Sequence, residues 1–264
     1  MLSGRLAVSE APVNMGWALD LDGVVWLDDL PIPGSADAVA RLRAVGERVV
    51  FCTNLSSRPV SETEAKLARH GIPAEGDVLT SATAAAGLVE PGARVLVCAG
   101  PGVVEALEAR GAEVVWDGEA DAVVVGLHLD FDYERLRVAS AAVRAGARLI
   151  GTNADPTFPT AQGLTPGGGA ILAAVATASG VEPVVAGKPE EPMAALVRER
   201  LGADGTVVGD RADTDGLLAQ RLGYRFVLVE TGSTPPGATA PGGADLVAPD
   251  LATAVDQLLG APPP

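Results

Sequence analysis

Short apolar runs alternate with amphipathic stretches along most of the chain. Runs of this kind are typical of strands buried on both faces of a sheet. The strands predicted in this way are 17–21, 48–52, 94–98, 122–126, 148–150, 184–186, 206–208 and 224–229. The stretches between them have helical periodicity, and several are followed by glycine, which favours the end of a helix. The helices predicted in this way are 36–44, 61–70, 103–110, 133–145, 169–178, 192–201 and 213–221.

Strand alternating with helix at this spacing predicts an α/β fold, with a parallel sheet covered on both faces. Proline and glycine are dense around residues 72–92 and 179–183, which marks two crossing points between domains. A chain of 264 residues is long enough for one or two domains with a sizeable core.

The composition of the chain indicates which partners and which cellular location to expect. The net charge of −15 leaves no basic patch to neutralise phosphates, so we expect no nucleic-acid partner. No apolar run approaches the ~20 residues of a membrane span. The segment 1–16 lacks the apolar centre of a secretion signal and is expected to be a frayed tail, which favours a cytoplasmic protein. Cys52 and Cys98 lie in predicted strands, as expected of buried, reduced thiols.

Two aspartates interrupt the apolar segment Trp17–Trp26. Asp20 and Asp22 lie at the expected end of a buried strand, where α/β sheets usually expose catalytic groups. Gly23 lets the backbone turn away after them. Paired carboxylates in this position indicate a metal-assisted site with a carboxylate nucleophile, and a solvated turn has the same spacing.

Two further segments place polar groups after predicted strands. Thr53 and Asn54 offer a hydroxyl and an amide to phosphoryl oxygens, although such residues also form turns and helix caps. Lys188 follows strand 184–186 and is one of only two lysines in an arginine-rich set of basic residues. A lysine in such a chain indicates the need for a compact point charge. The other one, Lys66, is expected on the solvated face of a polar helix.

Asp210 and Asp215 follow the strand at 206–208. Because the carboxyl ends of parallel strands meet at one edge of a sheet, we expect these acids to converge with Asp20 and Asp22. Each close pair of carboxylates repels by roughly 4 kcal/mol at an effective dielectric constant near 20. A hard divalent cation reverses that repulsion, and Mg²⁺ suits a site shared by carboxylates, water and a substrate phosphate.

The order of these motifs resembles that of the haloacid dehalogenase superfamily. The matching segments are Asp20-x-Asp22-Gly23-Val24, Thr53-Asn54, Lys188 and Gly209-Asp210-x4-Asp215. The chain is similar to the phosphatases of subfamily IIA, which include NagD and the p-nitrophenylphosphatase-like proteins, over about residues 17–250. The resemblance implies a Rossmann-like parallel-sheet core with an inserted α/β cap of the C2 type. The expected division is core at 1–81 and 180–264 and cap at 82–179.

The resemblance also implies roles for the motif residues. Asp20 would be the nucleophile and Asp22 the general acid and base, with Lys188 as the third catalytic residue. Thr53 and Asn54, together with Lys188, would bind the phosphate group.

For the metal, the resemblance implies Mg²⁺ bound by Asp20, the main-chain carbonyl of Asp22 and Asp210. Asp215 would act on the metal through water, or would orient Lys188.

The segment Gly151-Thr-Asn153-x-Asp155-Pro-Thr-Phe158-Pro matches the cap signature of the family. We expect 151–166 to be a proline-rich cap loop without regular structure, in which Asn153, Asp155 and Phe158 contact the leaving group of the substrate. His128 replaces an aspartate that is common in relatives.

The function predicted from these observations is Mg²⁺-dependent hydrolysis of a small phosphate ester through an aspartyl-phosphate intermediate. The substrate class is a sugar or polyol phosphate, a nucleotide or an aryl phosphate, and the cap allows a homodimer. A non-catalytic role on the same fold is one alternative. A dinucleotide-binding protein is another, because Gly100-Pro-Gly102-Val-Val-Glu105 opens a helix after a strand and resembles Gly-x-Gly-x-x-Gly.

Overall fold

The computed structural model describes residues 15–160, 163–233 and 243–260. Its larger sheet has six parallel strands in the order β15-β14-β13-β1-β4-β5. These strands are β1 (Gly16–Leu19), β4 (Arg48–Thr53), β5 (Val78–Thr80), β13 (Gly205–Gly209), β14 (Arg225–Val229) and β15 (Leu246–Ala248). The predicted α/β class is confirmed. The tail expected at 1–16 lies almost entirely outside the described residues.

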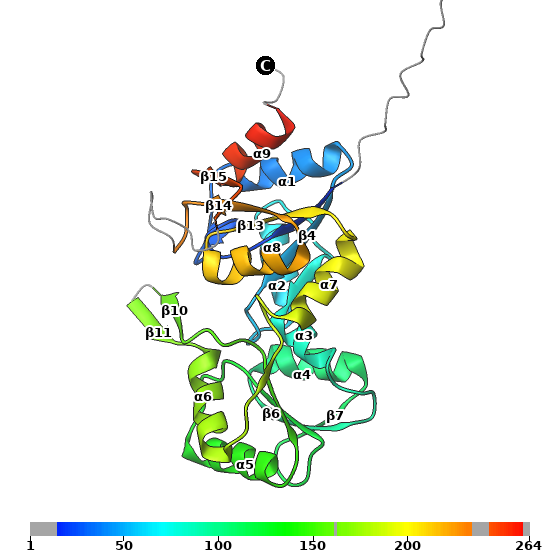
Figure 1. Ribbon diagram of the computed structural model, residues 1–264, viewed down its shortest axis with the longest axis vertical. Helices are drawn as coiled ribbons and strands as arrows, with labels where there is room; N and C mark the ends of the chain where they lie inside the picture. Colours follow the sequence, from blue (N-terminus) through cyan, green and yellow to red (C-terminus); the bar gives the residue numbers. More distant parts are fainter. Residues whose placement is uncertain (1–14, 161–162, 234–242, 261–264) are drawn as a thin grey trace, which may run out of the picture.

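A second sheet has five parallel strands in the order β12-β9-β8-β6-β7. Its strands are β6 (Arg94–Cys98), β7 (Glu113–Val115), β8 (Ala122–Val125), β9 (Arg148–Gly151) and β12 (Val184–Val185). Figure 1 shows the two sheets at different heights along the long axis of the molecule, with the second sheet in the lower half. We call the unit around this second sheet the cap and the unit around the larger sheet the core.

The helices of the core form two layers, because successive strand residues point to opposite faces. Trp17 and Leu19 face the layer of α1 (Ser35–Ala44), α2 (Val60–Arg69) and α9 (Leu251–Leu259). Ala18 faces the layer of α7 (Glu191–Leu201) and α8 (Leu217–Leu222).

The apolar interior of the α7 side continues into the cap. The same cluster of buried side chains includes Val197 of α7 and Val95 and Val97 of β6. It also takes in α3 (Ser81–Ala86) and α4 (Pro101–Arg110), while α5 (Tyr133–Arg144) and α6 (Gly168–Ser179) cover the other face of the cap sheet. The division into core and cap at 81/82 and 179/180 therefore remains a prediction, because one apolar cluster spans both units.

Strand β12 departs from the expected arrangement. The sequence pattern placed 184–186 with the core strands whose ends build the site, but Val184 and Val185 pair with Ile150 and Gly151 of the cap sheet. The strand is only two residues long, and the chain then passes directly from the cap to the core. Lys188 therefore reaches the site from the crossing point and not from a strand of the core sheet.

The expected irregular loop at 151–166 is also corrected. Residues Thr157–Thr160 (β10) and Gly163–Pro166 (β11) form an antiparallel hairpin, in which Phe158 pairs with Thr165. In a two-stranded antiparallel ribbon, the N–H of every second residue points away from the partner strand, so a proline at such a position breaks no hydrogen bond between the strands. A second short hairpin joins β2 (Trp26–Leu27) and β3 (Leu30–Pro31).

Both cysteines are buried and unpaired, as predicted. Burial raises the pKa of Cys52 and of Cys98 to about 12, which keeps both thiols protonated. Within the described ranges, no helix is both long enough and apolar enough to cross a membrane.

Candidate active site

A buried lysine between two aspartates forms the centre of the site. The Nζ atom of Lys188 lies 2.8 Å from Oδ1 of Asp20 and 2.7 Å from Oδ1 of Asp215. Asp20 directly follows β1, and its main-chain N–H donates to the carbonyl of Val208 on β13 at 2.9 Å. The side chains of Lys188 and Asp215 are 3% and 1% exposed, so protein and not water satisfies these charges.

Burial governs how these three groups ionise. It raises the pKa of Asp20 to about 6 and that of Asp215 to about 6, against the opposing charge of Lys188. Burial by itself lowers the pKa of Lys188, but the two carboxylates outweigh it and raise that pKa well above its usual value. The lysine is therefore a permanent cation at the base of the site.

Asp210 adds a third carboxylate. It follows β13, is 2% exposed, and has a raised pKa because of burial and then because of Asp215. Asp20, Asp210 and Asp215 each offer a carboxylate oxygen, and the three atoms lie within 4.8 Å of one another. Asp215 sits in a π-helical turn, Ala212–Gly216, which opens helix α8. Such turns are frequent at functional sites.

The donor set fits Mg²⁺. Three hard oxygen ligands converge, and a divalent cation would offset both the burial that mainly raises the pKa of these acids and their smaller mutual repulsion. Asp20 and Asp215 both contact Lys188, but Asp215 also accepts from the main-chain N–H of Arg211 at 3.3 Å, so both of its oxygens contact protein donors, which favours a role in orienting the lysine.

Asp22 is separate from this cluster. Its side chain is solvent-exposed, and its Oδ1 accepts a hydrogen bond from Nε1 of Trp26 at 2.9 Å. Neighbouring protein atoms still raise its pKa through partial desolvation, while the indole N–H opposes that rise. Gly23 has φ +84°, in agreement with the expected turn of the backbone away from the strand. Asp22 can therefore contribute its main-chain carbonyl to a metal and keep its carboxyl group for proton transfer.

Thr53 and Asn54 end β4 next to the site, but they are used differently. The hydroxyl of buried Thr53 accepts from the main-chain N–H of Leu55 at 3.0 Å, which leaves its proton for a phosphoryl oxygen. The amide of Asn54 is turned to the main chain of Lys188 and to the carboxylate of Asp155. Thr53 thus fits the predicted role in phosphate binding, whereas the side chain of Asn54 is engaged with protein.

Two of the three predicted cap residues lie together, because the main-chain N–H of Asp155 donates to Oδ1 of Asn153 at 3.1 Å. Asn153 is buried and donates to the carbonyl of Asn54 at 2.9 Å, and Asp155 contacts Asn54 and Arg211. Phe158 lies farther along the chain on hairpin strand β10 and is half-buried. The leaving-group role predicted for the three residues remains a prediction.

His128 follows β8 in the cap. Burial and then Arg135 lower the pKa of its imidazole, so the neutral form is favoured. Its Nδ1 atom is buried and has no hydrogen-bond partner among the described residues.

Three residues beside the site, Trp26, Lys66 and Arg211, carry no sequence signal that predicts a role there. Lys66 is not on a solvated helix face: its side chain is 17% exposed, and its Nζ lies 4.1 Å from the centroid of the Trp26 ring. The only sequence signal for Arg211 is its position directly after Asp210, and that position predicts no partner in the cap.

The glycines of the suspected dinucleotide loop have a structural explanation. A Cβ atom at Gly102 would lie 2.1 Å from the carbonyl oxygen of Arg58, and one at Gly100 would lie 2.6 Å from that of Ser57. Glu105 accepts a hydrogen bond from the main-chain N–H of Val60 at 2.8 Å. The loop therefore packs the cap against the start of α2, and the core backbone occupies the space that a pyrophosphate would need.

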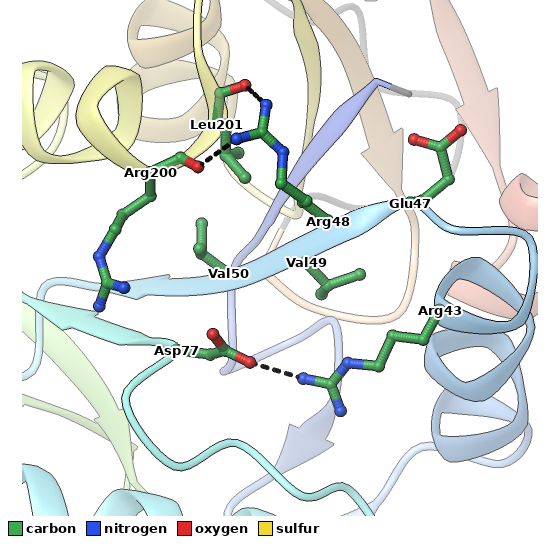
Figure 2. A pocket seen from close by; sticks show the side chains of 8 residues that line it. All are labelled: Arg43, Glu47, Arg48, Val49, Val50, Asp77, Arg200 and Leu201. Carbon is green, nitrogen blue, oxygen red and sulfur yellow. Dashed lines mark hydrogen bonds and ion pairs between the residues drawn. The ribbon is translucent and has the colours of Figure 1, made fainter. Parts of the chain in front are cut away.

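A pocket of about 320 Å³ lies at the amino end of β4, on the opposite edge of the core sheet (Figure 2). Its arginines are used within the protein: Arg48 donates to the carbonyls of Arg200 and Leu201, and Arg43 pairs with Asp77 at 2.9 Å. These side chains tie the end of α7 to the sheet, so the pocket is separate from the chemistry described above.

Comparisons with known proteins agree with the geometry. A family model described as haloacid dehalogenase-like hydrolase matches residues 17–113, and one described as HAD-hydrolase-like matches residues 185–254. The chain is 36% identical to an acid sugar phosphatase of Staphylococcus saprophyticus over 225 residues, which are 83% of this chain and 87% of that protein. It belongs to the haloacid dehalogenase-like hydrolase family.

Within this family, the chain is 40% identical over 223 residues to a D-glycerol 3-phosphate phosphatase of Mycobacterium tuberculosis. That match covers 81% of this chain but 62% of the relative, so the chain spans less than two thirds of its length. A crystal structure of glycerol phosphate phosphatase from the same organism, in complex with magnesium, superposes with a TM-score of 0.82 at 35% identity, over 91% of this chain and 76% of that one. The resemblance stated from the motifs is confirmed.

Proposed function

We propose that this haloacid dehalogenase-like hydrolase is a Mg²⁺-dependent phosphatase of small phosphorylated metabolites. The observation that carries the proposal is the position of Asp20, with Oδ1 bound by Lys188 and with Asp210 beside it. A carboxylate held by a permanent cation has one oxygen fixed and the other, Oδ2, available for attack. The named relatives are phosphatases, which supports the same reaction class.

In the proposed first step, Oδ2 of Asp20 attacks phosphorus and the phosphorus–oxygen bond of the ester breaks. Asp22 gives its proton to the leaving oxygen, and its raised pKa favours the protonated form that this step needs. In the second step, Asp22 takes a proton from water, whose oxygen displaces Asp20 and releases inorganic phosphate. Lys188 and the hydroxyl of Thr53 bind the phosphoryl oxygens in both steps.

The residues proposed to hold Mg²⁺ are Asp20, Asp210 and the main-chain carbonyl of Asp22, with Asp215 acting on Lys188. When bound, the ion neutralises the carboxylates and the phosphoryl oxygens. Without that charge, the acids of the site would repel a phosphate ester.

The substrate class is proposed as sugar or polyol phosphates, nucleotides or aryl phosphates. We rank polyol and sugar phosphates first, and the names of two kinds of relative, a glycerol phosphate phosphatase and an acid sugar phosphatase, support this order. Phe158 on the β10–β11 hairpin is the cap residue that we propose to contact the leaving group, because it is half-buried and its ring is apolar.

A homodimer through the cap is also proposed. Trp116, Leu129 and Tyr133 are 48%, 82% and 81% exposed, and Arg135 lies over the Trp116 ring at 5.5 Å, so these side chains gather near the start of α5. Light scattering of the wild type and of Tyr133→Glu tests this: a dimeric wild type and a monomeric variant are expected, and a monomeric wild type contradicts it. A cytoplasmic location is proposed from the two buried, unpaired thiols.

The direct test is phosphate release over a panel of phosphorylated metabolites with Mg²⁺ present. Asp20→Asn is the matched negative control, because the amide keeps the shape of the carboxylate and cannot attack phosphorus. Hydrolysis of at least one class by the wild type and none by Asp20→Asn is expected. Equal rates in the two proteins would mean that phosphate is released elsewhere.

A further inference from the structure

One carboxylate of the cap, that of Asp155, contacts two loops of the core site. Asp155 lies between strand β9 and the β10–β11 hairpin, and its side chain is 18% exposed. Its Oδ2 accepts from Nδ2 of Asn54 at 2.9 Å, and its Oδ1 lies 3.2 Å from Nη1 of Arg211. Each oxygen therefore serves a different loop of the core: one loop follows β4 and the other follows β13.

Asn54, which contacts Asp155, also hydrogen-bonds the main chain of the catalytic lysine, Lys188. Its Oδ1 accepts from the main-chain N–H of Lys188 at 2.8 Å, and its Nδ2 donates to the main-chain carbonyl of Lys188 at 3.1 Å. An asparagine amide has two N–H donors, and here one goes to Lys188 and the other to Asp155. The side chain thus has no N–H left for a phosphate and instead fixes the backbone from which Lys188 extends.

The space around this contact is filled. A Cβ atom at Gly187 would lie 2.5 Å from Oδ1 of Asn54. The carbonyl of Asn54 accepts from Ser81 Oγ at 2.7 Å and from Asn153 Nδ2 at 2.9 Å. Asn54 has little freedom to turn, so movement of its partners is transmitted to Lys188.

Arg211 makes the second connection. Its main-chain N–H donates to Oδ2 of Asp215 at 3.3 Å, and it directly follows Asp210 in the chain. Its guanidinium group is shared between Asp155 of the cap and Asp213 of its own loop, which it contacts at 2.8 Å. Asp155 therefore touches the loop that carries both the metal-binding acid and the acid that orients Lys188.

We propose that Asp155 is a positioning residue that couples the docked cap to the phosphoryl-transfer site, and that it does not read the leaving group. The proposal rests on the proposed phosphatase function. A carboxylate is needed because two acceptor oxygens must face two separate donors, and an amide offers only one. Loss of the Asp155 carboxylate therefore removes one contact of Asn54 and one of Arg211, and the turnover of every substrate is expected to fall by a similar factor.

The kinetic test compares Asp155→Asn and Asp155→Ala with the wild type on acetyl phosphate, glycerol phosphate and p-nitrophenyl phosphate. Misplacement of a catalytic group by about 1 Å costs on the order of 100-fold in rate. We expect kcat to fall by about 10- to 100-fold on all three substrates, with their order by kcat/KM unchanged and KM changed by less than about threefold. The matched control is Asp213→Asn, which also removes a carboxylate from Arg211 but leaves the cap contact in place, and its kcat should remain within about threefold.

A changed order of substrates, with acetyl phosphate turnover retained, would overturn the proposal and make Asp155 a specificity residue. An equal loss in Asp213→Asn would overturn it too, because the effect would then belong to Arg211 and not to the cap.

A second measurement does not depend on activity. In a double-mutant cycle of thermal unfolding, Asp155→Ala and Arg211→Gln should be non-additive, because contacting residues share one interaction. Additive changes in Tm would overturn the contact itself. A wild type that hydrolyses no phosphate ester would refute the proposed function, while the cycle would still test the coupling of cap to core.

Discussion

The indole N–H of Trp26 donates to Oδ1 of Asp22 at 2.9 Å, and Asp22, the proposed general acid, is not one of the three clustered acids Asp20, Asp210 and Asp215. Trp26 is 2% exposed, and the ammonium group of Lys66 lies over its ring. The contact fixes one rotamer of the Asp22 side chain.

Trp26→Phe should therefore affect proton transfer more than attack. The variant keeps an aromatic ring in the core and removes the donor. We expect about a tenfold larger loss of kcat on glycerol phosphate than on p-nitrophenyl phosphate, whose leaving group needs no proton. Trp116→Phe, at an exposed site in the cap, is the control and should change neither rate. Equal losses on both esters would show that Trp26 has a packing role only.

Lys188→Arg should be almost inactive although it keeps the positive charge. Nζ of Lys188 lies between two carboxylates, and the lysine side chain is only 3% exposed. A planar guanidinium group is too large for this buried position. Steady-state assays should show at least about a 100-fold fall in kcat, whereas Lys66→Arg should keep most of the activity. An active Lys188→Arg would exclude the compact-charge argument.

Lys188→Met tests the energetic part of the same arrangement. Removing one partner of a buried ion pair leaves an uncompensated charge and costs about 3 to 5 kcal/mol in the free energy of unfolding. In the absence of metal, the melting temperature of Lys188→Met should be clearly below that of the wild type. A similar Tm would mean that Asp20 and Asp215 become protonated without consequence for the fold.

Mg²⁺ should raise the melting temperature, because an ion that binds only the native state stabilises it by mass action. The shift should be absent in Asp210→Asn, and chelation by EDTA should abolish turnover in the wild type. Asp117→Asn, at an exposed acid of the cap, should behave as the wild type does. Full activity after complete removal of divalent ions would contradict the metal assignment.

The pH dependence of stability should include a contribution from His128. Burial and Arg135 lower its native pKa below the ordinary 6.5, while Asp130 and Asp132 oppose that shift. Between the lowered pKa and 6.5 the unfolded chain binds more protons than the native one, so the free energy of unfolding rises with pH across this window. From about pH 7.5 to about 5.5, the wild type should lose more stability than His128→Gln in chemical denaturation. Parallel curves for the two proteins would contradict this sign.

Much of the fold could be predicted because its signals are local. The apolar runs that become β1, β4, β6, β8, β13 and β14 are buried on both faces, and a short apolar run bounded by polar residues predicts such a strand from the local sequence. Helix α3 could not be predicted, because Ser81–Ala86 is a helix of only six small residues without a polar face. Its start is fixed by the capping box between Thr80 and Thr83.

The convergence of Asp20, Asp210 and Asp215 could also be expected, because each follows a strand of one parallel sheet. The orientation of side chains could not. The amide of Asn54 is a chemical group that could bind phosphate. In the structure, its side chain contacts Lys188 and Asp155, which are distant from it in the sequence. Such contacts form only when the cap packs against the core, and no local sequence pattern predicts how the two pack.

The pairing of β12 with β9 has a consequence for protein engineering. Grafting a foreign cap by cutting the chain between residues 179 and 180 would leave Val184 and Val185 on the recipient side, without the strand that they pair with. The unpaired residues Val184 and Val185 lie just before Lys188 in the chain, which contacts Asp20. The graft would therefore disturb the position of the recipient's lysine as well as the specificity of the donor cap. A functional chimera should therefore exchange everything up to Val185 and keep the Asn54–Asp155 pair matched across the new junction.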